Sequence, residues 1–600
     1  MKNILLSLLF FLISLGAKSQ PFNPLLAGML QDTLNTYVSQ ITNIKGMSAS
    51  VYIPGQGVWN GVSGNSFAGQ PITTDMRFGI ASNSKLFCSV MLLKLAEKNI
   101  ISLADSLKDW LTISNPNINP NITIRQLLNH SSGISDPFFA SPWFDTINLN
   151  PTRVFTPNEV LGWVGAPLFP AGTNWGYSNT NYVLAGMVAK SATGRNLSAL
   201  IRDSILTPLN LNNTFIDVEE PVNGTIAHRW WNSIDYHDTS RVGLNSAVGY
   251  AGSIFSKASD MAQWYTALFN GQVINQSSMN ELTGFLTTSN PAYQYGLGLS
   301  REITQGYQYW GHGGRTWGYK SKMIYDTCLH VTVAGLANSD PAGMDGVTFL
   351  LYRAVKNHIP GCSGAITGLT TVCKGSNGIT YTVPPIANAL SYTWTLPTGA
   401  TGTSNTNSIT VNFGTSAVSG NIAVQGVNNY GGGGTSSLPV TVNPVPPAPV
   451  ITQNGNILSS SAPSGNQWYN AGGIIAGATA PTYTISSSGT YYTIVTVAGC
   501  SSAPSNSINA VVTAVTSIGN GGSWKIYPNP VSEYFLNSIE GISVLHSTLC
   551  IFNTAGVLLK TEKILHSQQY VDVNRLSPGV YMIELRSGVF SARQKLVIQR

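Results

Sequence analysis

Charged side chains are almost absent from one long stretch of this chain, and that stretch divides the sequence into three parts. Between His358 and Lys525 the only charged residue is Lys374, and Thr, Ser, Gly, Asn, Val and Pro predominate. The text on either side contains ordinary mixtures of charged and apolar residues. A chain of 600 residues is also too long for one hydrophobic core. The sequence therefore predicts several domains, with a boundary near residue 360.

The N-terminus has the pattern of a secretory signal. Lys2 precedes an apolar run from Ile4 to Leu15, and small residues follow that run. We expect a signal peptide over residues 1–19 and a mature chain that begins near Gln20. A membrane anchor is the alternative, but the run is shorter than the ~20 residues that a spanning helix needs. No later segment is apolar over such a length, so the pattern predicts a soluble, exported protein.

The cysteines and the net charge exclude several kinds of site. Six cysteines in so long a chain cannot form a disulfide scaffold. Only Cys362 and Cys373 are close enough in sequence to suggest a local bridge. No Cys/His spacing resembles a zinc site, and a net charge of +6 is too dilute over this length to indicate nucleic acid. The sequence implies no metal, no cofactor and no nucleic-acid partner.

Helix and strand signals occur together before residue 360. Apolar residues recur at helical spacing from Asn23 to Gln40, and again from Val347 to Val355. Two short β-rich segments, SASVYI and GVWNGVSG, follow the first of these helices. The opening and closing helices bracket an α+β domain, which we place at residues 20–360.

The charge-poor region consists of short β-rich segments separated by turn residues. Segments such as ITYTV, SYTWTL, SITVNF and NIAVQGV are typical of a sandwich. The proline-rich joint VNPVPPAPV, a stiff and extended type of linker, separates them from NQWYN, TYTI and GTYYTIVTV. We predict two all-β modules, at residues 361–445 and 446–515. Both look like immunoglobulin-like repeats, and the first resembles the PKD-like domains of bacterial surface proteins. We favour a spacer role over ligand binding.

The last segment, residues 523–600, carries an ordered set of signals in strand-rich text. They are Tyr527-Pro528-Asn529-Pro530, the strand STLCIFNTAGVLL, the turn LSPG leading into VYMIEL, and Lys595 in the final strand. The set resembles the C-terminal sorting domain of the type IX secretion system. A third structural sandwich explains the strands but not the ordered signals. The resemblance implies passage across an outer membrane and removal of this domain, with release or surface attachment.

Ser82 and Lys85 stand three residues apart where an apolar helix begins. Residues at this spacing share a helix face, so the Lys85 ammonium can reach the Ser82 hydroxyl. Free backbone N–H groups at a helix start favour an alkoxide or an oxyanion nearby. A serine that only caps a helix would need no distant partners. Distant partners therefore decide whether Ser82 is a nucleophile.

Two later motifs supply candidate partners. Tyr177-Ser178-Asn179 lies in a loop that opens another helix, although a tyrosine corner or a turn explains this pattern about as well. His312-Gly313-Gly314 precedes a segment that looks like a strand, and its glycines allow a ligand close to the backbone. A hairpin turn is the alternative there. We assign His130, which lies between the serine and the tyrosine, to packing or to a loop hydrogen bond.

Taken together and in this order, the motifs resemble those of the serine β-lactamase and penicillin-binding-protein-like hydrolases. They fall at Ser82-Asn83-Ser84-Lys85, Tyr177-Ser178-Asn179 and His312-Gly313-Gly314, with SSGI and AGSIFSKASDMAQW in support. The resemblance is strongest to the branch with class C β-lactamases, D-alanyl-D-alanine carboxypeptidases and related esterases. It covers nearly all of residues 20–360. It implies an antiparallel sheet flanked by helices, plus a mostly helical subdomain.

The resemblance also implies roles for individual residues. Ser82 attacks a carbonyl to form an acyl-enzyme that water later hydrolyses. Lys85 and Tyr177 are both candidate bases, and Asn179 holds Lys85 and the substrate amide. The backbone N–H groups of Ser82 and Arg315 form the oxyanion hole, where one donor is typically worth ~3 to 4 kcal/mol. Lys85 can accept the proton only if its pKa falls from about 10.4 to roughly 7 or 8.

The third motif departs from the β-lactamase pattern. β-Lactamases usually carry a lysine there that meets the substrate carboxylate, whereas His312 is mostly neutral at pH 7 unless a carboxylate raises its pKa. Arg315, Lys320 and Lys322 are candidates for the missing charge. We expect His312-Gly313-Gly314 to bind substrate, and we place peptidase or esterase chemistry above β-lactamase chemistry.

The segment HRWWNSIDYH belongs to none of these motifs. Its tryptophans, Trp230 and Trp231, either roof the substrate cleft or pack in the core. A metal site that uses His228 and His237 is the less favoured alternative.

The prediction is therefore a serine hydrolase that is secreted or held at the cell surface. Its substrate is an ester or an acyl-D-amino-acid peptide, with cell-wall peptides as one source, and its C-terminal domain engages the type IX secretion machinery. A true β-lactamase is the first alternative. An inactive adhesin that binds cell walls is the second, but retention of Ser82, Lys85, Tyr177 and Asn179 argues against it.

Overall fold

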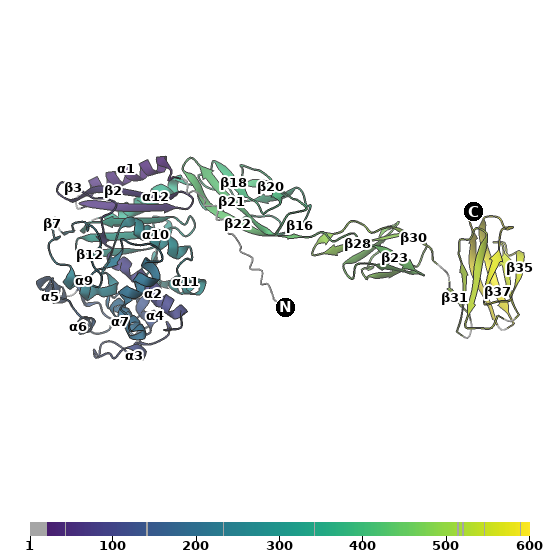
Figure 1. The fold of residues 1–600 in the computed structure, drawn as a ribbon, viewed down its shortest axis with the longest axis horizontal. Helices are drawn as coiled ribbons and strands as arrows, with labels where there is room; N and C mark the ends of the chain where they lie inside the picture. Colours follow the sequence, from purple (N-terminus) through teal and green to yellow (C-terminus); the bar gives the residue numbers. More distant parts are fainter. Residues whose placement is uncertain are drawn as a thin grey trace, which may run out of the picture.

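The computed structural model describes residues 21–600 apart from 42–43, 140–141, 232, 341–342, 513–514, 519–520, 545 and 589. It shows an α+β domain followed by β-sandwich modules that lie in a row (Figure 1). The predicted order of an α+β domain before all-β modules is confirmed. The signal peptide expected over residues 1–19 lies outside the described residues. No described helix combines the length and apolar character that crossing a membrane requires.

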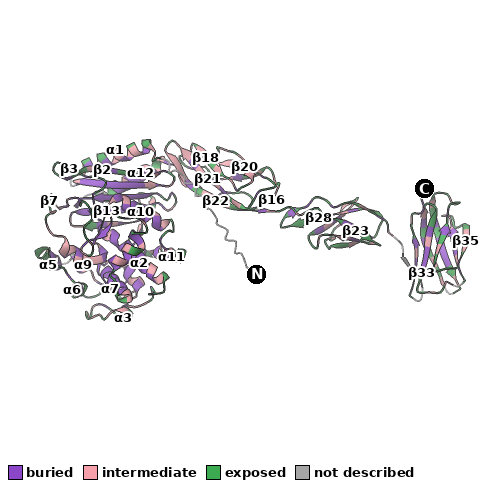
Figure 2. Ribbon diagram, viewed as in Figure 1, coloured by how far each residue is buried: buried purple, intermediate pink, exposed green. Residues whose placement is uncertain are grey.

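A nine-stranded antiparallel sheet forms the frame of the first domain, in the order β3-β2-β1-β14-β13-β12-β11-β10-β9. Strands β1 and β14 are almost entirely buried, and Figure 2 shows buried residues concentrated inside this domain. The strands are β1 (Gly46–Ile53), β2 (Gly57–Phe67), β3 (Gln70–Pro71), β9 (Leu286–Thr287), β10 (Tyr293–Tyr295), β11 (Ser300–Thr304), β12 (Tyr307–Thr316), β13 (Tyr319–Tyr325) and β14 (Thr332–Ala337).

The two predicted terminal helices cover one face of this sheet. Helix α1 (Pro24–Gln40) and helix α12 (Met344–His358) share a core with strands β1 and β14. The buried residues of α1 recur at helical spacing because one stripe of the helix faces the sheet; they are Leu26, Leu30, Leu34 and Val38. Asn23 begins α1, and its side chain accepts a hydrogen bond from the Leu26 amide.

Helix α10 (Ala258–Phe269) packs on the other face of the sheet. It shares a core with a mostly helical subdomain, which Figure 1 shows below the sheet. That core lies around α2 (Ser84–Glu97) and α7 (Thr180–Thr193). The remaining helices are α3 (Leu107–Trp110), α4 (Ile124–Leu128), α5 (Trp143–Leu149), α6 (Pro157–Leu161), α8 (Leu197–Ile201), α9 (Val242–Val248) and α11 (Gln276–Leu282).

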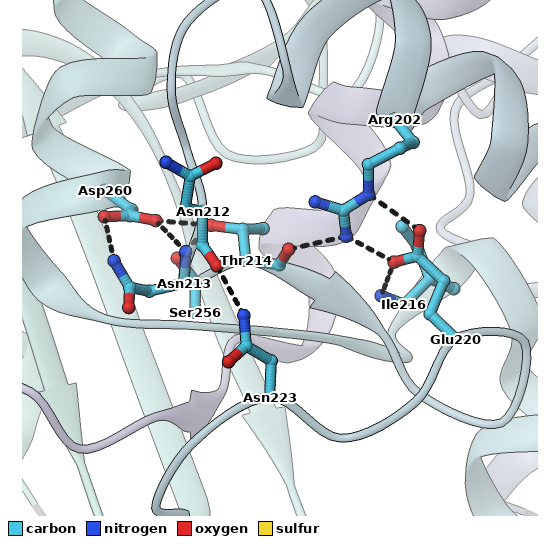
Figure 3. A network of polar contacts seen from close by, with 9 residues as sticks. All are labelled: Arg202, Asn212, Asn213, Thr214, Ile216, Glu220, Asn223, Ser256 and Asp260. Atoms are coloured by element: carbon cyan, nitrogen blue, oxygen red, sulfur yellow. Dashed lines mark hydrogen bonds and ion pairs between the residues drawn. The ribbon is translucent and has the colours of Figure 1, made fainter.

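A small sheet leads the chain to the candidate serine. Strand β8 (Ile254–Ser256) lies between β4 (Phe78–Gly79), which ends just before Ser82, and β5 (Phe215–Ile216). Figure 3 shows the polar network beside it. Asp260 accepts hydrogen bonds from the Asn213 amide at 3.0 Å and the Thr214 hydroxyl at 3.2 Å. Thr214 also bonds Ser256, so the network joins the residue before β5 to the last residue of β8.

A second small sheet lies near the end of the main sheet. Its strands are β6 (Trp230–Trp231), β7 (Ile234–Asp235) and β15 (Ser339–Asp340). Strand β6 pairs in parallel with β15 and antiparallel with β7.

Each sandwich module packs two sheets around a small apolar core. The first contains β16 (Thr371–Cys373), β17 (Ile379–Thr382), β18 (Ser391–Thr395), β19 (Ala400–Thr401), β20 (Ser408–Phe413), β21 (Gly420–Asn428) and β22 (Gly431–Asn443). The second contains β23 (Ile451–Asn454), β24 (Ile457–Ser460), β25 (Asn466–Asn470), β26 (Gly473–Ile474), β27 (Thr482–Thr484), β28 (Gly489–Val497), β29 (Cys500–Ser501) and β30 (Ile508–Ala510). The last contains β31 (Val515–Ile518), β32 (Gly522–Tyr527), β33 (Tyr534–Glu540), β34 (Ser547–Phe552), β35 (Leu558–Ile564), β36 (Gln568–Asp572), β37 (Gly579–Ser587) and β38 (Phe590–Ile598).

The expected local bridge between Cys362 and Cys373 is wrong. Cys362 pairs with Cys328, which lies between β13 and β14, and Cys373 pairs with Cys500 of the second module. Cys373 ends β16 at the far end of the first module (Figure 1), whereas Cys362 lies where the chain leaves the α+β domain. Each of the two cysteines is thus bonded to a cysteine on another segment of the chain.

Candidate active site

Ser82 lies in a single 3₁₀ turn, Ala81–Asn83, directly before helix α2. The preceding residue, Ala81, has a φ of +49°, a left-handed conformation that is unfavourable for a residue with a Cβ. Such strain persists only where the surroundings impose it, and it is concentrated at functional sites. The N-cap positions of this turn and of α2 are Ile80 and Asn83, so Ser82 is the N-cap of neither element. Its hydroxyl is free to take the distant partners that a cap would not need.

Those partners converge on the Ser82 oxygen. The Lys85 Nζ lies 3.0 Å from Ser82 Oγ, one helical turn along α2. The Tyr177 hydroxyl donates to the same Oγ at 2.7 Å. Asn179, at the start of α7, accepts from Lys85 Nζ through its Oδ1 at 2.7 Å. The structure thus brings together all four residues that the first two motifs singled out.

Two other contacts of Lys85 determine which part of its amino group faces Ser82. Asn179 Oδ1 and the Ala251 carbonyl, which lies 2.8 Å from Nζ, can only accept hydrogen bonds. A neutral amine has two hydrogens and one lone pair, so the two acceptors take both hydrogens. The lone pair then faces the Ser82 hydroxyl, which is the arrangement that a general base requires.

Burial sets the protonation states of this group. Lys85 is completely buried, and desolvation lowers its pKa to about 7 although the Asp136 carboxylate opposes the shift. Burial has the opposite effect on Tyr177 and raises the pKa of its phenol well above the usual value. Near neutral pH, Lys85 can therefore accept a proton while Tyr177 remains a hydrogen-bond donor.

Asp136 is a member of this group that the sequence analysis missed. Its Oδ2 accepts from the Asn179 side-chain amide at 2.8 Å and from the Asn179 backbone at 3.2 Å. Because the amide nitrogen faces Asp136, the amide oxygen must face Lys85. The available signal was a single acidic residue two positions after SSGI, in an otherwise uncharged loop.

Ser82 opens into a cavity of about 410 Å³, and Lys85 lies behind its wall. Gly313 and Gly314 of β12 form part of the lining. A Cβ on Gly314 would lie 2.3 Å from the Ile80 carbonyl, so a glycine there lets β12 pack against the serine turn. A Cβ on Gly313 would meet nothing within 4 Å, which leaves that side open to a ligand. Arg315 also lines the cavity, together with Ala81 and Ser82.

His312 does not line this cavity, although the sequence predicts it to bind substrate. Its Nδ1 lies 2.5 Å from the Gly313 carbonyl, which can only accept, so Nδ1 carries the proton. Its Nε2 then accepts from the Tyr295 hydroxyl at 2.8 Å. Burial lowers the pKa of His312 to about 3, and the nearby Lys85 acts in the same direction. The imidazole is neutral, and both of its nitrogens are bonded within the protein.

The three basic residues considered for the missing charge have different positions. Lys322 is buried and forms an ion pair with Glu302 at 2.6 Å, away from the cavity lining. Arg315 and Lys320 do line the cavity. The Arg315 Nε donates to the buried Asp340 at 2.7 Å, while about half of the arginine side chain is exposed.

His130 is buried among aromatic rings, and it accepts hydrogen bonds from the Ser178 amide and the Asn181 side chain. Its ring centre lies 4.3 Å from that of Tyr177, so the expected packing and loop contacts are confirmed.

No described residue of the HRWWNSIDYH segment lines the catalytic cavity. Trp230 donates to the Ser66 carbonyl, and Trp231 lines a neighbouring cavity. His228 bonds Asp235 and stacks on His237 with ring centres 3.7 Å apart. Within the described part of the chain, no three His, Cys, Asp or Glu side chains are grouped as metal ligands.

Comparison with known families gives matches in the same order as the modules. Residues 34–355, more than half of the chain, match the family described as Beta-lactamase. Residues 359–440 match the PKD-like domain, and residues 525–599 match the Secretion system C-terminal sorting domain. The resemblances to a PKD-like domain and to a type IX sorting domain are thereby confirmed, and the sorting domain indicates secretion or cell-surface attachment.

Similar individual proteins include enzymes that act on peptides and amides. Penicillin-binding protein 4* of Bacillus subtilis is 28% identical over 291 residues, which are 45% of this chain and 62% of that protein. A D-aminopeptidase of Cereibacter sphaeroides is 25% identical over 317 residues, which are 49% of this chain and 56% of that protein. The match thus spans 62% and 56% of the length of these two relatives, which is less than two thirds of each.

Among solved structures, the D-amino acid amidase of Ochrobactrum anthropi SV3 in complex with L-phenylalanine is similar. Its TM-score is 0.50 at 25% identity, with 55% of this chain and 98% of that chain covered.

Proposed function

We propose, because this chain belongs to the beta-lactamase family, that it is an exported serine hydrolase in which Ser82 forms an acyl-enzyme with an ester or an acyl-D-amino-acid peptide. The observation that carries the proposal is the convergence of Lys85 Nζ and the Tyr177 hydroxyl on Ser82 Oγ, at 3.0 and 2.7 Å. Similarity to a D-aminopeptidase and to a D-amino acid amidase favours a D-configured substrate.

In the first step, Lys85 takes the proton of the Ser82 hydroxyl while Oγ attacks the substrate carbonyl carbon. Negative charge develops on the carbonyl oxygen, which the backbone N–H groups of Ser82 and Arg315 are proposed to bind. The intermediate then collapses, the bond to the amine or alcohol breaks, and the proton held by Lys85 goes to the leaving atom. Through this step the Tyr177 hydroxyl donates a hydrogen bond to Ser82 Oγ or to the leaving atom.

In the second step, water repeats the sequence in reverse. Lys85 accepts a proton from water, the resulting hydroxide attacks the acyl carbon, and the proton returns to Ser82 Oγ as the acid leaves. Lys85 is preferred over Tyr177 as the base because its pKa lies near 7, whereas burial raises the pKa of the phenol.

The export route is proposed from the two ends of the chain. The expected signal peptide at residues 1–19 would give passage across an inner membrane. The domain at residues 523–600 would then direct passage through the type IX machinery. The modules at 361–445 and 446–515 are proposed to act as spacers between the hydrolase at 20–360 and a surface.

Labelling with a fluorescent phosphonate tests the nucleophile. The full-length protein should acquire one label, which mass spectrometry locates on Ser82, and Ser82→Ala should acquire none. Ser84→Ala is the matched control, because the Ser84 hydroxyl accepts from the Ile254 amide and has no catalytic role in the proposal. A label that persists in Ser82→Ala, or absence of label on the unaltered protein, contradicts the proposal. The second result would favour the inactive binding protein.

Penicillin is a further candidate substrate, because Arg315 and Lys320 could meet its carboxylate in the cavity. Mass spectrometry after incubation with penicillin reports that acyl-enzyme on the same serine.

A further inference from the structure

A second cavity lies next to the catalytic one and has a different chemical character. Its volume is about 320 Å³, and its lining consists of Phe144, Asn148, Trp231, Tyr236, Thr239 and Trp317. Four of these six residues are aromatic, and none is charged. Trp231, Tyr236 and Trp317 are partly exposed, so a ligand can reach their rings. An uncharged cavity with aromatic walls suits an apolar ring.

The two cavities share a wall. Phe144 and Trp317 line both, and their rings meet edge to face with centres 5.2 Å apart. Trp317 directly follows Arg315 and Thr316, which line the catalytic cavity. One part of a substrate can therefore occupy the second cavity while another part lies in the catalytic cavity beside Arg315 and Thr316.

Hydrogen bonds and strand pairing fix the walls of the second cavity. The buried Arg229 donates to the carbonyls of Tyr236 and Thr239, at 3.0 and 2.5 Å, and so holds the backbone of both lining residues. Trp231 pairs with Asp340 across β6 and β15. Arg315 is bonded to that Asp340, and its guanidinium lies 5.4 Å from the centre of the Trp231 ring. The aromatic wall is thus tied to a residue that the proposed mechanism uses for the oxyanion.

We propose that this second cavity is a subsite for a large apolar side chain, preferably aromatic, on the residue that precedes the one whose carbonyl reacts. The proposal rests on the proposed hydrolase function. An extended peptide advances ~3.3 Å per residue, so the residue before the one whose carbonyl reacts is the first whose side chain can extend from Arg315 toward Trp317. We assign the second cavity to the acyl part of the substrate rather than to the leaving group. The acyl part stays bonded to Ser82 until the second step, so its contacts with the cavity can assist both acylation and hydrolysis.

Two matched substrates test the subsite: N-acetyl-Phe-D-Ala and N-acetyl-Ala-D-Ala, each as a p-nitrophenyl ester. The measured quantity is the ratio of kcat/KM for the Phe substrate to that for the Ala substrate on each enzyme. This ratio cancels differences in the amount of folded protein. We expect a ratio on the order of 10 to 100 for the unaltered protein, the range for an apolar group that fills a matched pocket.

Trp231→Ala should bring this ratio close to one, and Trp231→Phe, which keeps an aromatic wall, should retain most of it. Tyr236→Ala should lower it as well. A ratio near one in the unaltered protein, or a Trp231→Ala variant that loses both activities equally, overturns the subsite but leaves the hydrolase proposal intact.

A binding measurement separates this proposal from the mechanism. Calorimetry with N-acetyl-Phe-D-Ala amide on Ser82→Ala should show tighter binding than on the double variant Ser82→Ala/Trp231→Ala. This difference can appear even if the chain proves to be no hydrolase. Equal binding of the peptide to both variants overturns the subsite. Displacement of the peptide by N-acetylglucosamine also overturns it, because the cavity then binds a sugar ring rather than an apolar side chain.

Discussion

The hydroxyl of Ser82 lies between a buried amine and a buried phenol whose pKa values shift in opposite directions. Burial disfavours the charged form of each group, so it lowers the pKa of Lys85 to about 7 and raises that of Tyr177. The same physical cause thus yields an acceptor and a donor side by side. Asp136 moderates the effect, because its carboxylate favours the ammonium form of Lys85.

The first prediction at this scale concerns the pH dependence of acylation. Lys85 is a base only when neutral, so kcat/KM for an ester should fall as pH drops through about 7 and should level off above it. Replacement of Asp136 by Asn removes a charge that raises the pKa of Lys85, so the midpoint should move to lower pH. Kinetics between pH 5 and 9 on both proteins measure this shift.

A midpoint that rises in Asp136→Asn, or a profile without any fall on the acidic side, would assign the titration to another group. The comparison uses the midpoint rather than the plateau, because loss of the bond from Asn179 can lower the rate at every pH.

At the scale of the element, strand β12 shows how one histidine acts through its neighbours. The sequence favours His312 as a contact for substrate, whereas its nitrogens bond Tyr295 on β10 and the Gly313 carbonyl. We propose that His312 is a positioning residue that holds the strand edge beside Ser82. Because burial and the nearby Lys85 lower its pKa to about 3, the imidazole is neutral and offers no charge to a substrate carboxylate.

A second prediction tests that arrangement. Tyr295→Phe leaves the buried Nε2 of His312 without its donor, so the α+β domain should lose ~1–3 kcal/mol of stability. Tyr307→Phe is the matched control, because the Tyr307 hydroxyl bonds the exposed Asn357, and its loss should cost less. Thermal unfolding followed by the loss of phosphonate labelling reports this domain. Equal destabilisation by the two variants would show that the buried bond between Tyr295 and His312 contributes no more stability than the exposed bond of Tyr307.

At the scale of the whole molecule, the first sandwich is docked on the α+β domain. Gln56 donates to the Tyr430 carbonyl at 2.9 Å, Asn428 donates to the His358 carbonyl at 2.7 Å, and Tyr430 packs against the core beneath α1 and α12. The Cys328–Cys362 disulfide crosses the same junction. The next joint has no regular structure over residues 444–450, but the Cys373–Cys500 disulfide spans it.

A third prediction follows from this covalent arrangement. Limited proteolysis should cut within residues 444–450, and the two products should stay together on a non-reducing gel because Cys373 and Cys500 lie on opposite sides of the cut. Reduction should release a fragment that contains the whole α+β domain and retains phosphonate labelling. Cys373→Ser should release it without a reductant. Separation of the products of the unaltered protein before reduction would refute the pairing.

Much of this organisation was available from the sequence, because it depends on local patterns. Helical spacing predicted α1 and α12, β-rich segments predicted the sandwiches, and the ordered motifs selected Ser82, Lys85, Tyr177 and Asn179. Residues three apart on a helix must share a face, so the contact between Ser82 and Lys85 required no knowledge of the rest of the chain. Asp136 and Tyr295 carried no such spacing, since each bonds a residue on a different element, Asn179 and His312 respectively.

The sequence by itself determined the order of the domains, their fold classes and the principal candidates for chemistry, because periodicity and motif order are properties of neighbouring residues. The tertiary structure alone decided that Lys85 is buried enough for a pKa near 7, that His312 faces inward, and that Cys362 and Cys373 bond other cysteines. It also decided that Trp231 and Trp317 meet at one aromatic cavity. Burial and disulfide geometry depend on which distant segments pack together, and no local pattern in the chain specifies those distances.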